Sequence, residues 1–112
     1  MTPTIAPLSQ IIDGIRVADG TTTTCDSCQQ RLEEGQPVHC RVEQQSLVDE
    51  WRPDGLHCEN CGYQDRLDIA GTALVSGHLG TARDTRTQTS WLVLLEPEVM
   101  SVYPHWLTTR SK

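Results

Sequence analysis

Two short stretches decide the fold of this chain: Cys25-Asp26-Ser27-Cys28 and Cys58-Glu59-Asn60-Cys61. Each is a C-x-x-C pair, and 29 residues separate one pair from the other. Two residues between cysteines allow one turn of backbone to present both sulfurs at about 2.3 Å from a metal. Four such sulfurs satisfy a tetrahedral Zn²⁺ and leave no open position for a substrate. The spacing therefore predicts one structural zinc ion, held by Cys25, Cys28, Cys58 and Cys61.

Other uses of four cysteines must be weighed against zinc. The same ligands could hold iron in a rubredoxin-like site, or could pair as two disulfides in a secreted protein. The first ten residues lack the basic start and the apolar stretch of a signal peptide. We therefore expect a cytoplasmic protein, in which thiols stay reduced and bind metal. A total of five cysteines also fits a metal site with one spare cysteine better than a closed set of disulfides.

Two histidines and the fifth cysteine lie close to the ligands in the sequence. His57 directly precedes Cys58, and His39 directly precedes Cys40. His57 or Cys40 could replace one of the four ligands, and together with His39 they could build a second metal site. We favour a simpler interpretation, in which Cys40 is a small buried hydrophobe and the two histidines are surface groups or lie next to the metal ligands without binding the metal. His57 would then donate a hydrogen bond to a zinc-bound sulfur.

Composition and charge limit the partners of this chain. The 112 residues carry a net charge of −6. All of this net negative charge lies in residues 1–62, which hold ten acidic and four basic side chains. Residues 63–112 hold equal numbers of acidic and basic side chains. An acidic zinc-binding half is a poor non-specific ligand for nucleic acid. No apolar run approaches the roughly 18 residues that a membrane span requires, so we expect no contact with a membrane.

Hydrophobic periodicity predicts a small, mostly-β protein. Alternation of apolar and polar residues predicts a strand over 38–43, with Cys40 facing inward. Short apolar runs predict further strands near 47–51, 72–75, 91–95 and 99–103. The fold class is therefore a zinc ribbon, or a related knuckle-and-hairpin module, extended by a small antiparallel sheet. The stretch 91–95 is apolar on both faces and is expected to be the central strand.

Turn-forming residues set the expected boundaries. Arg52-Pro53-Asp54-Gly55 predicts a turn, and Gly77 and Gly80 are expected to end the strand near 72–75. We expect residues 1–24 to form an N-terminal arm with a short helix, and residues 25–107 to form the zinc-binding β domain. The tail, 108–112, is expected to be frayed.

The frame of these motifs resembles a known group of proteins. Cys25-Asp26-x-Cys28, Trp51 and Leu56-His57-Cys58-x-x-Cys61, together with the stretch Gly80–Thr89, look like the small uncharacterised zinc-finger proteins of haloarchaea. The similarity spans roughly Cys25 to Tyr103. An acidic chain in which eight of nine basic residues are arginine agrees with a salt-loving source, although a GC-rich bacterial or phage genome would give a similar bias. The resemblance implies zinc binding and no particular activity.

Two functions follow as hypotheses. The first is a protein–protein adaptor or small regulatory protein, which presents a rigid acidic surface to a partner or to its own copy. The alternative is a nucleic-acid-binding regulator related to transcription, which would use Arg83, Arg86 and Arg110 in the balanced half. The chain shows no nucleophile motif, phosphate loop or paired carboxylates, and a four-thiolate zinc cannot activate water. We therefore expect no enzyme, with catalysis by His39, His57 or Cys40 as the weakest hypothesis.

Overall fold

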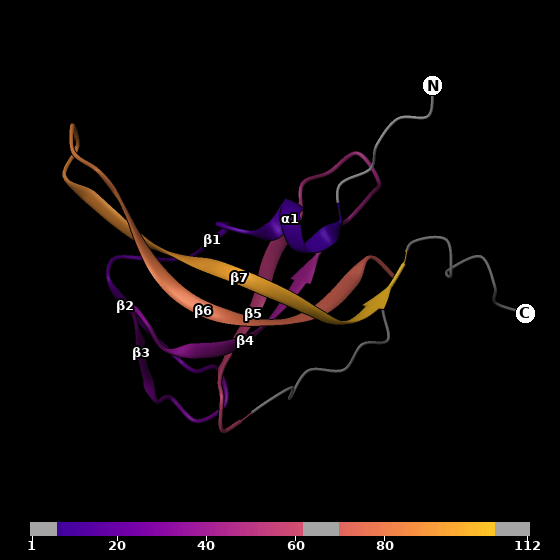
Figure 1. Ribbon diagram of the computed structural model, residues 1–112, viewed down its shortest axis with the longest axis horizontal. Helices are drawn as coiled ribbons and strands as arrows, with labels where there is room; N and C mark the ends of the chain where they lie inside the picture. Colours follow the sequence, from indigo (N-terminus) through magenta and orange to yellow (C-terminus); the bar gives the residue numbers. More distant parts are fainter. Residues whose placement is uncertain (1–6, 62–69, 105–112) are drawn as a thin grey trace, which may run out of the picture.

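The computed structural model describes residues 7–61 and 70–104, which form two antiparallel sheets and one short helix (Figure 1). In chain order the elements are α1 (Leu8–Ile12), β1 (Arg16–Asp19), β2 (Thr22–Thr24), β3 (Arg31–Glu33), β4 (Pro37–Glu43), β5 (Arg52–Cys58), β6 (Thr72–Asp84) and β7 (Thr89–Tyr103). The larger sheet has the strand order β1-β7-β6-β4-β5, and the smaller sheet pairs β2 with β3. The prediction of a small, mostly-β fold with an antiparallel sheet beside the cysteine turns is confirmed.

A long hairpin of β6 and β7 forms the middle of the larger sheet. The two strands pair from Thr72 with Tyr103 to Asp84 with Thr89. In Figure 1 both strands curve, and their connecting turn projects beyond the rest of the sheet. The expectation that 91–95 is the central strand is wrong in detail, because β6 occupies the middle and β7 lies next to it. β1, from the N-terminal part of the chain, covers the other edge of β7.

The two strands predicted at 91–95 and 99–103 are halves of one strand, β7. Pro97 lies between them, which is why the sequence suggested a break. The β6–β7 ladder shifts its register at this point, between Leu95 and Glu98. A proline has no N–H to donate, so it is accommodated at a bulge, where the ladder is interrupted, without ending the strand.

Gly77 and Gly80 do not end a strand, as the sequence suggested, but lie inside β6. Both are sites where β7 approaches closely. A Cβ added at Gly77 would lie 2.8 Å from the backbone oxygen of Leu95 and 2.9 Å from Cδ1 of Leu94. A Cβ added at Gly80 would meet only side-chain atoms, chiefly the tip of Leu95. These glycines therefore allow close packing of the hairpin.

The strand predicted at 47–51 is wrong, because these residues belong to the loop between β4 and β5. The expected turn at residues 52–55 instead opens β5. β5 is an edge strand, so Pro53 can occupy it without removing a hydrogen bond from a central ladder. The register shifts between β4 and β5 so that Asp54 is the extra residue, and its carboxylate pairs with Arg41.

One hydrophobic core joins the sheet, the helix and the cysteine turns. In β4 the side chains of Val38, Cys40 and Val42 are at most 1% exposed, while the alternate residues face the other side. The prediction that Cys40 points inward is confirmed. Helix α1 contributes Ile12, which is fully buried. The core also includes Cys25, Leu32, Leu56, Cys58, Ala73, Val75, Leu79, Leu92 and Leu94.

We predict that Gly77→Ala destabilises the protein by about 1–3 kcal/mol, because the new Cβ meets backbone that cannot move aside cheaply. Gly80→Ala should cost less, since the half-exposed Leu95 side chain can turn away. Urea denaturation of the two variants and the wild type measures the difference. An equal or larger loss for Gly80→Ala would contradict this account of the hairpin.

Candidate metal centre

The structure brings the four cysteines of the two C-x-x-C pairs to one point. Their sulfur atoms all lie within 4.8 Å of one another. The sulfurs of Cys25 and Cys61 are 3.6 Å apart, and those of Cys28 and Cys58 are 3.7 Å apart. A tetrahedral ion with sulfur bonds of about 2.3 Å requires sulfurs separated by about 3.8 Å. The cluster therefore has the size of a tetrathiolate site and could hold a metal ion.

The first cysteine turn is built by backbone hydrogen bonds between β2 and β3. The amide of Cys25 donates to the carbonyl of Gln30 at 2.8 Å, and the amide of Gln29 donates back to the carbonyl of Cys25 at 2.9 Å. Gln29 has a positive φ of 67°, which reverses the chain after the second cysteine. The amide of Ser27 points at the sulfur of Cys25, at 3.4 Å. The turn thus directs a backbone dipole toward a sulfur ligand, as turns around metal-bound thiolates do.

The second cysteine turn follows directly from β5. Cys58 is the last residue of that strand and is 3% exposed. The amide of Cys61 donates to the carbonyl of Cys58 at 3.2 Å, so this pair also closes on itself. Cys25 is fully buried, Cys61 is half-buried and Cys28 is exposed. One side of the cluster therefore belongs to the core and the other reaches the surface.

Asp26 holds the first turn against β5. Its amide donates to the carbonyl of Leu56, and its Oδ2 accepts from the amide of Leu56, each at 2.9 Å. The aspartate thereby satisfies both backbone groups of an edge-strand residue that lies two positions before Cys58. Sequence reasoning missed this role. An aspartate beside a cysteine could have suggested it, because short acidic side chains often bond to nearby backbone amides.

His57 reaches the first turn through Ser27. Its Nδ1 lies 2.9 Å from the hydroxyl of Ser27, and the ring is 5% exposed. The hydrogen bond joins the residue before Cys58 to the residue before Cys28. The sequence predicted a hydrogen bond from His57 to a zinc-bound sulfur; the structure joins Nδ1 of His57 to the Ser27 hydroxyl, in the first C-x-x-C turn. Sequence reasoning missed Ser27, for which the sequence carries no distinctive signal.

The electrostatics of the thiols favour a cation. Burial raises the pKa of the Cys25 thiol, but hydrogen bonds from the backbone of Cys28, Cys58 and Ser27 outweigh burial and lower this pKa to about 5. The neighbouring thiols, with Cys58 first, raise the pKa of Cys61 to about 12. One thiolate therefore forms readily, while its neighbours oppose ionisation of the last thiol. A metal cation in the centre would allow all four to lose their protons.

The three residues considered for a second metal site do not all lie on one face of the sheet. His39 and His57 lie opposite each other on β4 and β5, so their side chains leave the same face of the sheet. Cys40 is adjacent to His39 in the strand and points to the other face, into the core. Over residues 7–61 and 70–104, the four-cysteine cluster is the one group of three or more His, Cys, Asp or Glu side chains placed to hold a metal.

The arginines considered for nucleic-acid binding lie near the turn between β6 and β7. Arg83, near the end of β6, borders a shallow hollow with Thr85, Gln88 and Ser90. Arg86 lies in the turn, with its backbone amide 2.9 Å from Oδ1 of Asp84 and its guanidinium 3.9 Å from the same oxygen. Arg110 lies outside the residues that the structure describes.

Comparison with known proteins gives one match. The family model of a domain of unknown function (DUF8112) matches residues 3–105, a range that contains both cysteine pairs and both sheets. No curated protein and no solved structure matches the chain. In the described part of the chain, no helix is long and apolar enough to cross a membrane.

We predict that Asp26→Ala lowers the free energy of unfolding by about 1–3 kcal/mol, because it leaves the Leu56 amide without its acceptor. Asp26→Asn should cost less, since the amide oxygen can still accept. Glu59→Ala is the matched control: this carboxylate occupies the same place in the other C-x-x-C pair and is exposed. Denaturant unfolding of the metal-loaded proteins measures the effect, and equal losses for Asp26→Ala and Glu59→Ala would contradict it.

Proposed function

Since this chain belongs to the family of the domain of unknown function DUF8112, whose match covers the whole cysteine cluster, we propose its function from the geometry of that cluster: it is a module folded around one structural Zn²⁺ that acts in protein–protein interaction. The main support is the convergence of four sulfurs, all within 4.8 Å of one another, at the junction of the two sheets.

Zinc fits the donor set best. Thiolates are soft ligands that select zinc or iron–sulfur chemistry, and four of them at tetrahedral positions are typical of structural zinc sites. All four positions around such an ion are filled by protein, so no water or substrate can be activated there. We therefore propose that the ion stabilises the fold and that the protein is not an enzyme. A reducing cytoplasm would keep the thiols available to the metal.

The surface supports a protein partner better than a nucleic-acid partner. Residues 1–62 hold ten acidic and four basic side chains, and three of these four arginines already pair with a carboxylate: Arg16 with Asp19, Arg31 with Glu33 and Arg41 with Asp54. Phosphate groups would be repelled by this part of the surface. In the balanced half, Asp84 offsets the charge of Arg86. The adaptor role therefore agrees with the charge distribution, and the nucleic-acid role depends on Arg83 and Arg86.

We predict that the purified protein carries one equivalent of zinc, and that Cys58→Ala loses it together with its cooperative thermal transition. Structural zinc sites contribute about 10–16 kcal/mol of apparent binding free energy, which a fold of this size cannot replace. Cys40→Ala is the control, because Cys40 is buried away from the cluster and should leave the zinc content unchanged. Elemental analysis and circular dichroism measure both properties.

A chelator added under reducing conditions provides the second arm of this experiment. Loss of zinc should abolish the thermal transition of the wild type, and added zinc should restore it. One equivalent of iron in place of zinc would refute the identity of the metal. An unchanged transition after complete removal of the metal would refute its structural role.

We predict that the zinc-loaded protein captures a protein from lysate of its native host, and that zinc-free Cys58→Ala does not. The same protein should show no saturable binding to labelled duplex DNA or RNA up to about 50 μM at physiological salt. Fluorescence anisotropy measures this binding.

Saturable binding that Arg83→Ala together with Arg86→Ala abolishes would favour the nucleic-acid alternative and contradict the adaptor role. Arg52→Ala serves as the control for loss of charge, since Arg52 is exposed at the start of β5, on a different part of the sheet. Repeating the titration at molar potassium chloride tests the conditions of a salt-rich cell, in which weak phosphate contacts are screened.

A further inference from the structure

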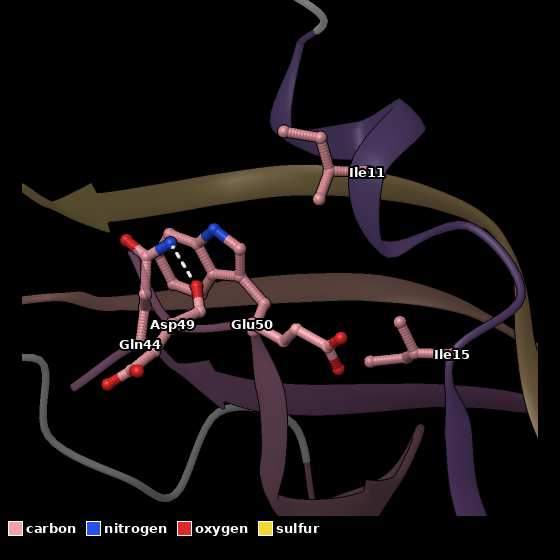
Figure 2. A pocket seen from close by; sticks show the side chains of 6 residues that line it. Ile11, Ile15, Gln44, Asp49 and Glu50 are labelled. Atoms are coloured by element: carbon pink, nitrogen blue, oxygen red, sulfur yellow. Dashed lines mark hydrogen bonds between the residues drawn. The ribbon is translucent and has the colours of Figure 1, made fainter. Parts of the chain in front are cut away.

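We propose that a groove between the N-terminal segment and the β4–β5 loop binds a short segment of a partner protein that carries a lysine or arginine next to an apolar side chain. The groove has a volume of about 360 Å³, and its lining residues are Ile11, Ile15, Gln44, Asp49, Glu50 and Trp51 (Figure 2). The proposal deepens the proposed function, on which it rests, by naming the surface and the chemistry of the partner.

The wall of the groove is apolar. Ile11 lies in α1 beside the buried Ile12, but its own side chain is 50% exposed. Ile15 and Trp51 are half-buried and pack on the edge of the core. The loop that forms the other side also carries Leu47 and Val48, which are 78% and 92% exposed. Large apolar side chains left in water near a hollow mark a surface that gains free energy when it is covered.

The polar side of the groove is acidic. Figure 2 shows the Glu50 carboxylate extending toward Ile15 across the groove, while the carboxylate of the preceding Asp49 points away from Ile15. Within the described residues, neither carboxylate forms an ion pair, whereas Asp19 and Asp54 each have an arginine. A lysine or arginine entering the groove could place its aliphatic stem along the isoleucines and its charge near Glu50. The indole of Trp51 would add a favourable face for such a cation.

The loop is held in place before any partner arrives. The amide of Asp49 donates to the carbonyl of Ser46 at 3.0 Å, and Nε2 of Gln44 donates to the carbonyl of Asp49 at 2.8 Å, the dashed line in Figure 2. At the start of the loop, the amide of Gln44 donates to the carbonyl of Gly71 at 2.7 Å. A rim ordered by these bonds loses little conformational entropy on binding, which favours recognition of a short segment.

The negative charge of Asp49 and Glu50 also decides which partner fits the groove. A two-fold contact between copies of this chain would bring Glu50 and Asp49 of one copy against the same residues of the other. Like charges at such an interface cost free energy, so a second copy fits poorly. A phosphate backbone or an anionic membrane would be repelled for the same reason. A cationic segment is the partner that the surface complements.

The test selects peptides from a phage-displayed library of random 12-residue peptides on the zinc-loaded full-length protein. We expect the selected peptides to combine a lysine or arginine with an adjacent apolar residue. Glu50→Gln should weaken their binding about tenfold and reduce its dependence on salt. Ile11→Ala should weaken it by a similar factor without unfolding the protein, because this side chain is half exposed. Glu59→Gln, an exposed carboxylate at the cysteine cluster, is the matched control and should change nothing.

Fluorescence anisotropy of labelled peptides gives the affinities, and analytical ultracentrifugation gives the oligomeric state. Peptides without a basic residue, or affinities equal in wild type, Glu50→Gln and Ile11→Ala, would overturn the groove as the binding site. A dimer that Glu50→Gln strengthens or Ile11→Ala weakens would overturn it in favour of a second copy. Failure of the library to yield any binding peptide would also overturn it, while the capture experiment above tests the adaptor role separately.

Discussion

The structure depends on one constraint: four sulfur atoms from two distant turns must meet within a few ångströms. Cys25 and Cys28 lie in the turn that connects β2 to β3. Cys58 ends the edge strand β5 of the larger sheet, and Cys61 lies in the turn after it. Bringing these thiols together fixes the small sheet against the large one. The two most buried cysteines of the cluster, Cys25 and Cys58, also belong to the hydrophobic core, so the constraint acts on packing as well as on the turns.

Two hydrogen-bonded links support the same junction. Asp26 completes the backbone of Leu56, and Ser27 bonds to His57. Both links join the interior of the first C-x-x-C pair to the residues that lead into the second. These links therefore help to position the cysteine cluster at the edge of the larger sheet.

The sequence allowed the cysteine cluster and much of the sheet to be predicted, because both depend on local patterns. Alternating residues located β4 and the inward direction of Cys40, and the C-x-x-C spacing located the cluster. The elements that the sequence misassigned, at residues 52–55 and around Gly77, depend on which strand lies next to them. Pro53 resembles a turn residue unless its strand is known to be at an edge, and Gly77 resembles a strand breaker unless its close neighbour is known. The bonds of Asp26 require the partner strand to be in place.

The pairing of β1 with β7 has a consequence for synthesis on the ribosome. Residues 16–19 pair with residues near 92, so the first strand of the sheet waits until most of the chain has been translated. Both cysteine pairs emerge well before that moment. The half of the chain that contains the cysteines can therefore begin to organise while the nascent chain is still growing, whereas the edge of β7 is covered only at the end. Until then the growing chain exposes an incomplete sheet, which is the state most open to aggregation or to a chaperone.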